Sequence, residues 1–209
     1  MLRKVSVKST SRASERKEQR RQAILDTASR LFSENGYDSV TLRAIAEELG
    51  YAHAALYRYF PDKLSILAEI CRNVFAEMLA EVSRLEQCSH NPQDALFAVS
   101  RGFVQFCLDH PQHFRAVFLG PENWGKIPAG EYIDAIGRGF FDRLVQVFLN
   151  ASGSAKMNTE TQLLDAHTWW TSLFGTVQVL ITSGPVKSMS DGKVLLERQM
   201  ETLWAGLKC

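Results

Sequence analysis

The chain has 209 residues, 45% of them hydrophobic, and a formal net charge of only +1. A chain of this size can bury its own core without disulfides or structural metals, and its near-neutral balance excludes a protein that is strongly basic or acidic throughout. Charge is nevertheless uneven, because twelve of the 24 Lys and Arg residues but only eight of the 23 Asp and Glu residues lie in positions 1–63. This excess favours a phosphate-facing surface there, although ordinary surfaces can show the same.

The first thirteen residues predict a disordered basic arm. This segment contains Arg3, Lys4, Lys8 and Arg12 and few hydrophobic side chains, so it has little apolar surface with which to fold. Two interpretations stay open at this point. The arm is either a solvated tail or a segment that contacts DNA phosphate or a minor groove.

Three helices are expected between about Ser14 and Phe60. The first has an apolar face that includes Ile24, Ala28 and Phe32 and ends near Gly36, where a left-handed residue closes a helix. The second begins at Thr41, whose hydroxyl can cap the free amides of its first turn, and ends at Gly50. The third runs from about residue 53 to 60, where Pro61 ends it.

The rest of the chain also predicts helices only. A longer helix over 62–86, with Asp62 as its cap, links the N-terminal part to a larger C-terminal part. Further helices are expected over 94–109, 111–119, 131–150 and 159–182 and at the C-terminus, with loops at 121–130, 151–156 and 183–192. The prediction is an all-α protein with an N-terminal helix-turn-helix domain, 14–63, and a C-terminal domain, 87–209.

Two short helices joined by a tight glycine turn, after a longer first helix, form a helix-turn-helix unit. Its third helix needs an outward face of small and hydrogen-bonding residues to enter the major groove of DNA. His53, Ala54, Tyr57 and Arg58 offer that face.

From about Ser14 to Lys63 the chain resembles the TetR family of regulators. The matching residues are Ala23–Ala28, Leu31–Phe32, Asn35–Tyr37, Thr41–Ala46, Leu49–Gly50, Leu56–Phe60 and Lys63. The resemblance implies that Thr41, Tyr59 and Lys63 bind phosphates and that Arg43 reaches the backbone or a base edge. It also implies that His53, Ala54 and Tyr57 lie in the major groove, where side chains choose the sequence.

Alternatives remain for several of these residues. Tyr57 or Tyr59 can instead be a core aromatic residue, Arg43 a solvated one, and Lys63 the partner of Asp62 or of another acidic neighbour. The chain also departs from the family just before and within the third helix. Ala52 stands where Ser or Thr is common, and His53-Ala54 replaces a frequent Lys-Gly, which puts base choice and affinity in doubt.

The C-terminal part resembles the ligand-binding domain of TetR relatives. Trp170 with Phe174-Gly175 resembles the Trp-x-x-x-His-Gly pattern of one subgroup, with Phe174 in place of His. Its aromatic residues line a pocket for a small organic ligand, or else form a core or dimer interface. The candidate ligand-binding residues are Phe103, Phe106, Phe118, Trp124, Phe140, Trp169, Trp170 and Phe174. The candidate dimer residues, on the last two helices, are Leu173, Val177, Leu180, Leu196, Met200 and Leu203.

The expected partners are double-stranded DNA, a second copy of the chain, and a small hydrophobic or amphipathic ligand. We expect no metal and no cofactor, because Cys71, Cys88, Cys107 and Cys209 form no CxxC pair and no zinc-binding pattern. Reduced thiols and the lack of a signal peptide or an apolar run of about 18 residues predict a cytoplasmic protein without a membrane span.

The sequence thus predicts a ligand-responsive transcription regulator that binds a pseudo-palindromic operator as a dimer. A repressor is the usual form, but the sequence does not separate it from an activator. Two alternatives are an enzyme and a DNA-binding protein whose core holds no ligand. GxSxG, HExxH and P-loop motifs are absent from the sequence, which argues against an enzyme.

Overall fold

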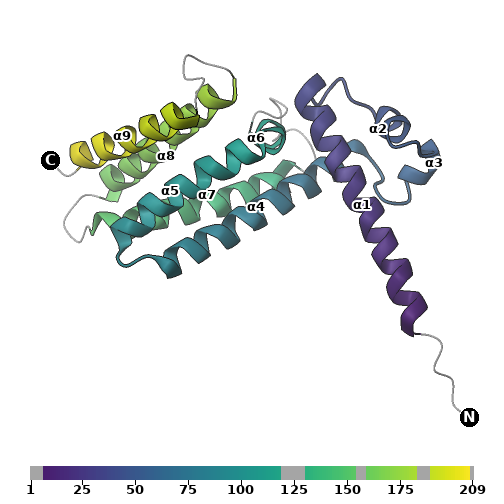
Figure 1. The fold of residues 1–209 in the computed structure, drawn as a ribbon, viewed down its shortest axis with the longest axis horizontal. Helices are drawn as coiled ribbons and strands as arrows, with labels where there is room; N and C mark the ends of the chain where they lie inside the picture. Colours follow the sequence, from purple (N-terminus) through teal and green to yellow (C-terminus); the bar gives the residue numbers. More distant parts are fainter. Residues whose placement is uncertain (1–6, 119–129, 154–158, 183–188, 208–209) are drawn as a thin grey trace, which may run out of the picture. The chain divides into compact units, whose positions relative to one another are not determined.

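The computed structural model describes residues 7–118, 130–153, 159–182 and 189–207, and they contain helices and no strand. The expectation of an all-α fold is therefore confirmed (Figure 1). The helices of the first half are α1 (Val7–Asn35), α2 (Leu42–Glu48), α3 (His53–Leu56), α4 (Lys63–Cys88) and α5 (Pro92–Asp109). The remaining helices are α6 (Pro111–Phe118), α7 (Gly130–Ser152), α8 (Thr159–Ile181) and α9 (Met189–Leu207).

Contacts divide the chain into two compact units. The first unit comprises residues 1–73 and 112–133, and the second comprises residues 74–111 and 134–209. Helix α4 begins in the first unit and continues into the second. The division into domains at residues 63 and 87 stays a prediction.

Local capping defines the helices of the first unit as the sequence predicts. Gly36 and Gly50 have positive φ angles of 79° and 66°, a conformation that costs glycine little. The side chain of Thr41 accepts a hydrogen bond of 3.1 Å from the backbone N–H of Ala44. The Asp62 carboxylate likewise accepts one of 2.6 Å from the N–H of Ser65, so both predicted N-caps are confirmed.

Two helix boundaries differ from the prediction. α1 begins at Val7, so residues 7–13, which the sequence assigns to a disordered arm, lie in its first turns. Extending an existing helix adds one hydrogen bond for each residue that is fixed, which a basic polar sequence does not prevent. α3 ends at Leu56 instead of Phe60, and a turn follows in which the N–H groups of Arg58 and Tyr59 donate to carbonyl oxygens three residues earlier.

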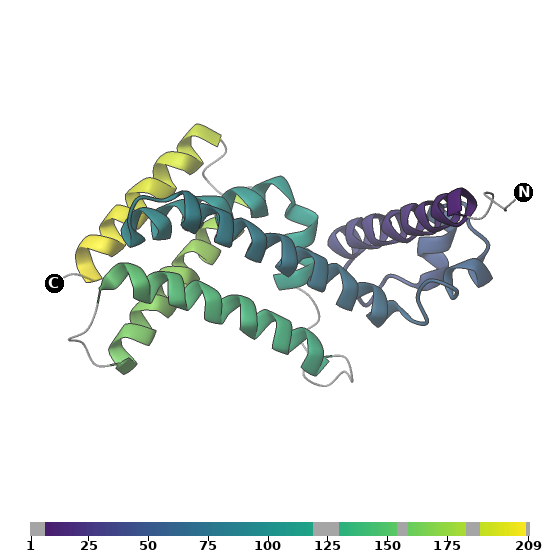
Figure 2. The ribbon, with the colours of Figure 1, turned by 90° about the horizontal axis from the view of Figure 1, so that it is seen from below.

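The first unit packs α2 and α3 on one side of α1, as Figures 1 and 2 both show. Ile24, Ala28 and Phe32 of α1 are buried, as are Ile45 of α2 and Leu56 of α3. The polar sides of these short helices consequently stay in solvent, and this exposes the outer face of α3.

The second unit is built around α5 and α8, and α9 runs beside α8 (Figure 1). Trp169 donates its indole N–H to the Ser100 hydroxyl at 3.0 Å. Trp170 donates to the Leu144 carbonyl oxygen at 2.9 Å. These adjacent tryptophans tie α8 to α5 and to α7, while Arg101 pairs with Glu197 at 2.5 Å and ties α5 to α9. No described helix has the length and apolar character that crossing a bilayer requires.

The described cysteines are free thiols in two environments. Cys88 is exposed, whereas Cys71 and Cys107 are buried, and burial raises the pKa of both buried thiols to about 12. Because the thiolate is the reactive form, little of it exists at these two positions near neutral pH. We expect iodoacetamide to alkylate Cys88 in the native protein, and Cys71 and Cys107 only after denaturation, as read by peptide mass spectrometry. Rapid alkylation of either buried thiol in the native protein would contradict this arrangement.

Candidate nucleic-acid interface

The turn between α2 and α3 positions α3, which carries the residues predicted to read bases. Gly50 adopts its left-handed conformation after α2, and the N–H of Tyr51 donates to the Ala46 carbonyl oxygen at 2.8 Å. Leu56 is fully buried, so the side of α3 that carries it packs into the core. The side chains on the opposite side of α3 therefore point into solvent.

The exposed side of α3 and of the turn after it brings together four residues predicted to contact DNA. His53, Ala54, Tyr57 and Arg58 are all exposed, with Tyr57 at 50%. The rings of His53 and Tyr57 meet edge to face, with their centroids 5.1 Å apart. Small Ala54 lies beside this pair and allows close approach of a partner. An aromatic side chain exposed to this extent is not a core residue, so that alternative is wrong for Tyr57.

Thr41 and Arg43 flank this surface at the start of α2. Both are exposed, and the Thr41 hydroxyl is already an acceptor in the helix cap. Arg43 pairs with Glu47 one turn later at 2.7 Å, and this hydrogen bond, with the carboxylate charge, raises the pKa of Arg43. An exposed pair of this kind is weak, so phosphate can replace Glu47 as its partner.

Lys63 contacts a different group from the one the sequence suggests. Its ammonium donates to the carbonyl oxygens of Tyr37 at 2.6 Å and of Asp38 at 3.3 Å, and lies 4.1 Å from the centre of the Tyr37 ring. Burial lowers the pKa of Lys63, while the charge of Asp38 opposes that shift. Lys63, the first residue of α4, thus holds the start of this helix against the turn before α2. It does not pair with Asp62. Its phosphate contact stays a prediction.

Tyr59 is half-buried, and its carbonyl oxygen belongs to a contact that sequence reasoning missed. Arg21 of α1 donates to this oxygen at 3.2 Å, stacks on the Phe60 ring at 4.4 Å, and pairs with Glu69 of α4. Arg72 also contacts Glu69, at 3.3 Å. Arg21 therefore holds the end of the recognition segment against both long helices of this unit. No sequence signal reveals this contact, because its partners lie 38 and 48 residues away.

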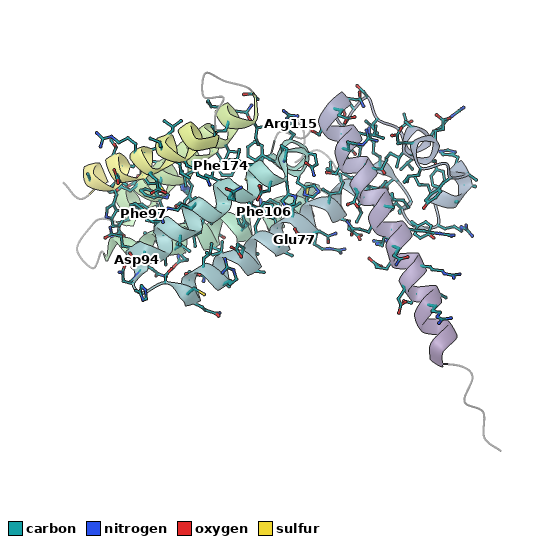
Figure 3. All side chains as sticks on the ribbon, viewed as in Figure 1. Glu77, Asp94, Phe97, Phe106, Arg115 and Phe174 are labelled. Carbon is teal, nitrogen blue, oxygen red and sulfur yellow. The ribbon has the colours of Figure 1, made fainter. Side chains whose placement is uncertain are left out.

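The predicted ligand-binding aromatics separate into groups. Phe103, Phe106 and Phe140 border a cavity of about 10 Å³, which is at the lower limit of the space needed to hold one water molecule. The other residues around this cavity are Met78, Glu81, Val82, Leu85, Val99 and Gly102. Phe174 of α8 contacts Phe103, with ring centroids 4.9 Å apart, and Figure 3 labels Phe106 and Phe174 on α5 and α8.

The remaining aromatics lie elsewhere. Trp169 and Trp170 are buried by their contacts with α5 and α7 and do not line this cavity. Phe118 contacts Phe114 within the first unit, with centroids 5.2 Å apart. Trp124 lies outside the described residues. Of the eight predicted aromatic residues, Phe103, Phe140, Trp169 and Trp170 are buried, and their ligand-binding role stays a prediction.

Four of the six predicted dimer residues need correction. Leu173, Val177, Leu196 and Met200 are buried within a single chain, so they leave no surface for a second copy to cover. The reason is that α8 packs against both α5 and α9, which accounts for the broad apolar stripes of the last two helices. Leu180 and Leu203 are half-buried. The same two helices expose other apolar residues, namely Leu163, Leu164, Val179, Val194 and Leu195.

Comparison with known protein families decides the identity of this arrangement. The sequence profile described as "Bacterial regulatory proteins, tetR family" matches residues 24–70, and that described as "Tetracyclin repressor-like, C-terminal domain" matches residues 96–203. The chain belongs to the TetR family. It is therefore a DNA-binding transcription regulator rather than an enzyme.

Individual TetR-family relatives resemble the chain over different lengths. The HTH-type transcriptional repressor KstR of Mycolicibacterium smegmatis is 35% identical over 83 residues, which cover 40% of this chain and 41% of that protein. The chain thus spans about two fifths of this relative. The repressor AcnR of Corynebacterium glutamicum is 26% identical over 184 residues, which cover 85% of this chain and 90% of AcnR. The structure of the ketosteroid transcriptional regulator KstR2 of Mycobacterium tuberculosis superimposes with a TM-score of 0.72 at 17% identity, covering 90% and 94% of the two chains, and so shares the fold.

The N-terminus of α3 differs from the TetR pattern in a way that can be tested. Ala52 has the extended geometry of an N-cap, φ −61° and ψ 133°, but makes no side-chain cap. Ala52→Ser is expected to raise the free energy of unfolding by about 1 kcal/mol, because the serine hydroxyl can accept a hydrogen bond from an unpaired backbone N–H in the first turn of α3. Chemical denaturation of the variant measures the change. Ala54→Ser, an exposed site inside α3, is the control and should give no such gain.

Proposed function

We propose that this TetR-family protein is a ligand-responsive repressor. In this proposal it binds a pseudo-palindromic operator in double-stranded DNA as a homodimer, within the bacterial cytoplasm. A small hydrophobic or amphipathic organic ligand releases it. The relatives KstR and AcnR are both named repressors, which supports this direction of control over activation.

The observation that carries the proposal is the free outer face of α3. His53, Tyr57 and Arg58 stand in solvent with hydrogen-bonding groups, and Ala54 beside them offers an apolar contact. A major groove presents distinct donors, acceptors and the thymine methyl group to such a face. Thr41 and Arg43, at the start of α2, are available for phosphate and fix the register of the helix in the groove.

Exposed apolar side chains on α8 and α9 support the homodimer. Leu164 is 65% exposed and Val194 69%, and Val179 and Leu195 lie on the same two helices. A second copy that pairs these helices with its own removes this apolar surface from water. Two-fold symmetry then presents two copies of α3 to the two half-sites of an operator.

The small aromatic cavity supports a response to ligand. It is nearly filled, so an organic molecule enters only when the surrounding side chains move apart. Met78, Val82 and Leu85 of α4 lie on its border, and α4 begins at Lys63 in the DNA-binding unit. A ligand that prefers the opened form shifts the equilibrium of α4 and thereby the operator affinity.

The first experiment is selection of bound DNA from a random duplex library, followed by gel shifts on the selected site. We expect a two-fold symmetric sequence. Arg58→Gln should weaken binding by about tenfold or more, whereas Arg84→Gln, which changes an exposed arginine of α4, should leave it nearly unchanged. Folded protein that binds all duplexes equally at moderate salt would contradict the proposal.

The second experiment tests the ligand response with decanoic acid and with the apolar dye anilinonaphthalene sulfonate. Either probe should release the selected duplex, and Phe103→Ala should change the concentration required, because Phe103 borders the cavity. Release by neither probe, together with no dye binding to the native protein, would favour the alternative of a DNA-binding protein without a ligand.

A further inference from the structure

The N-terminal half of α1 extends beyond the packed part of its unit. Every side chain from Arg12 to Arg20 is exposed, and the first buried residue after them in the helix is Ile24. Figure 1 shows this half of α1 running past α2 and α3. A helical segment without tertiary contacts is only marginally stable in water. A partner that binds this segment would therefore also order it.

The exposed segment carries a regular row of cations. Arg12, Arg16 and Arg20 are separated by four residues each, so they lie along one edge of the helix, and we call them the α1 stripe. Lys8 precedes Arg12 by the same step in the sequence. At 100° per residue, Glu15 and Glu18 fall beyond Arg12 on the side away from Arg20, so the stripe itself is purely basic.

The α1 stripe differs from other arginines of this unit in its partners. Arg21, Arg30, Arg43 and Arg72 all pair with carboxylates. None of the three stripe arginines makes an ion pair with a residue that the structure describes, and the same holds for Arg58. Arginines without a carboxylate partner thus occur on the recognition segment and on the N-terminal half of α1.

We propose that the α1 stripe binds phosphates of DNA outside the half-site that α3 reads. Its charge is complementary to the phosphate backbone, and its helix is part of the DNA-binding unit. The eight helical steps from Arg12 to Arg20 span about 12 Å, the rise of three to four base pairs. The stripe therefore lengthens the DNA footprint without reading bases. This inference rests on the DNA binding proposed above.

The test is the salt dependence of DNA binding by the full chain and by the variant Arg12→Gln/Arg16→Gln/Arg20→Gln. Gln keeps a helix propensity close to that of Arg, and circular dichroism verifies the helix content. The control, Arg84→Gln/Arg138→Gln/Arg198→Gln, removes the same charge from exposed positions of the second unit. Binding is measured on a mixed-sequence duplex, on the selected operator with long flanks, and on the operator trimmed to its symmetric core.

Each arginine that binds a phosphate contributes about 0.9 to the slope of log K against log salt, so removing all three should reduce the slope by about 3 for each chain. For the stripe variant on the long duplexes we expect this smaller slope and an affinity that is at least about tenfold lower at low salt. The effect on the operator trimmed to its core should be smaller. The control should keep the wild-type slope.

An unchanged slope in the stripe variant, or an equal reduction in the control, would overturn the inference. Binding to vesicles of phosphatidylserine and phosphatidylcholine is measured as well. Vesicle binding that depends on the stripe, without a change in the salt slope of DNA binding, would also overturn the inference. A wild-type protein without operator preference would contradict the proposed repressor. A stripe-dependent slope on the mixed-sequence duplex would still support phosphate binding by α1, so the two failures are distinguishable.

Discussion

Trp169→Ala is expected to lower the free energy of unfolding by about 3–5 kcal/mol. The side chain is completely buried at the centre of the second unit. Its ring centroid lies 5.6 Å from that of Phe97, 6.0 Å from that of Phe148 and 6.1 Å from that of Trp204. The substitution removes these ring contacts, leaves a cavity, and removes the hydrogen bond that the Ser100 hydroxyl oxygen accepts from the indole N–H.

Denaturant titration at one fixed protein concentration measures this effect, because a dimer gains stability with concentration. Trp169→Phe keeps an aromatic ring but lacks the hydrogen bond, so its effect should be smaller than that of Ala. Glu77→Ala, at an exposed site of α4 in the second unit and away from the proposed dimer surface, is the control and should change stability by less than about 0.5 kcal/mol. A decrease below about 1 kcal/mol for Trp169→Ala would show that α8 is not anchored as described.

Arg21→Ala is expected to weaken both the fold of the first unit and operator binding. The substitution removes the pair with Glu69, whose side chain is only 11% exposed, the bond to the Tyr59 carbonyl oxygen and the contact with the Phe60 ring. The substitution leaves the largely buried Glu69 carboxylate with one arginine, and we expect it to lower the free energy of unfolding by about 2–3 kcal/mol. This is less than the loss of a fully buried pair would cost, because the Arg21 side chain is 27% exposed. The end of the recognition segment is also no longer held by α1, so we expect at least tenfold weaker operator binding.

Arg30→Ala is the matched control for this prediction. Arg30 lies on the same helix and pairs with Glu34 at 2.9 Å and Glu48 at 2.6 Å, but its side chain is 43% exposed. Such surface pairs contribute at most about 1 kcal/mol. Arg21→Lys keeps the charge without the planar fork and should fall between wild type and Arg21→Ala. Equal effects of Arg21→Ala and Arg30→Ala on stability and on gel shifts would refute a special role for Arg21.

Features that depend on neighbouring residues were predictable from the sequence. The caps at Thr41 and Asp62 join groups three residues apart, and Gly36 and Gly50 close helices by their own backbone freedom. The uncapped start of α3 at Ala52 follows from the same local rule. The exposed side of α3 was also predictable, because the burial of Leu56 fixes which way the opposite residues point.

Contacts between distant residues were not predictable in this way. An apolar stripe shows that a helix face is buried, but it does not show which surface covers it. The stripes therefore predict that Leu173 of α8 and Met200 of α9 meet a second subunit, although both are buried within one chain, where α8 packs against α5 and α9. The same limit explains Lys63, whose ammonium lies against backbone carbonyls 25 and 26 residues earlier in the chain.

Helix periodicity, caps and glycine turns are local properties, so sequence alone predicts an all-helical chain with a helix-turn-helix and an outward face at His53–Arg58. Packing in three dimensions then settles which polar groups remain available for a partner. It joins Arg21 to Glu69 and Lys63 to the turn at Tyr37, and it leaves Arg58 and the α1 stripe without carboxylate partners among the described residues. A charged side chain pairs with whatever the fold places within a few ångströms, and this distance is set by packing rather than by sequence spacing.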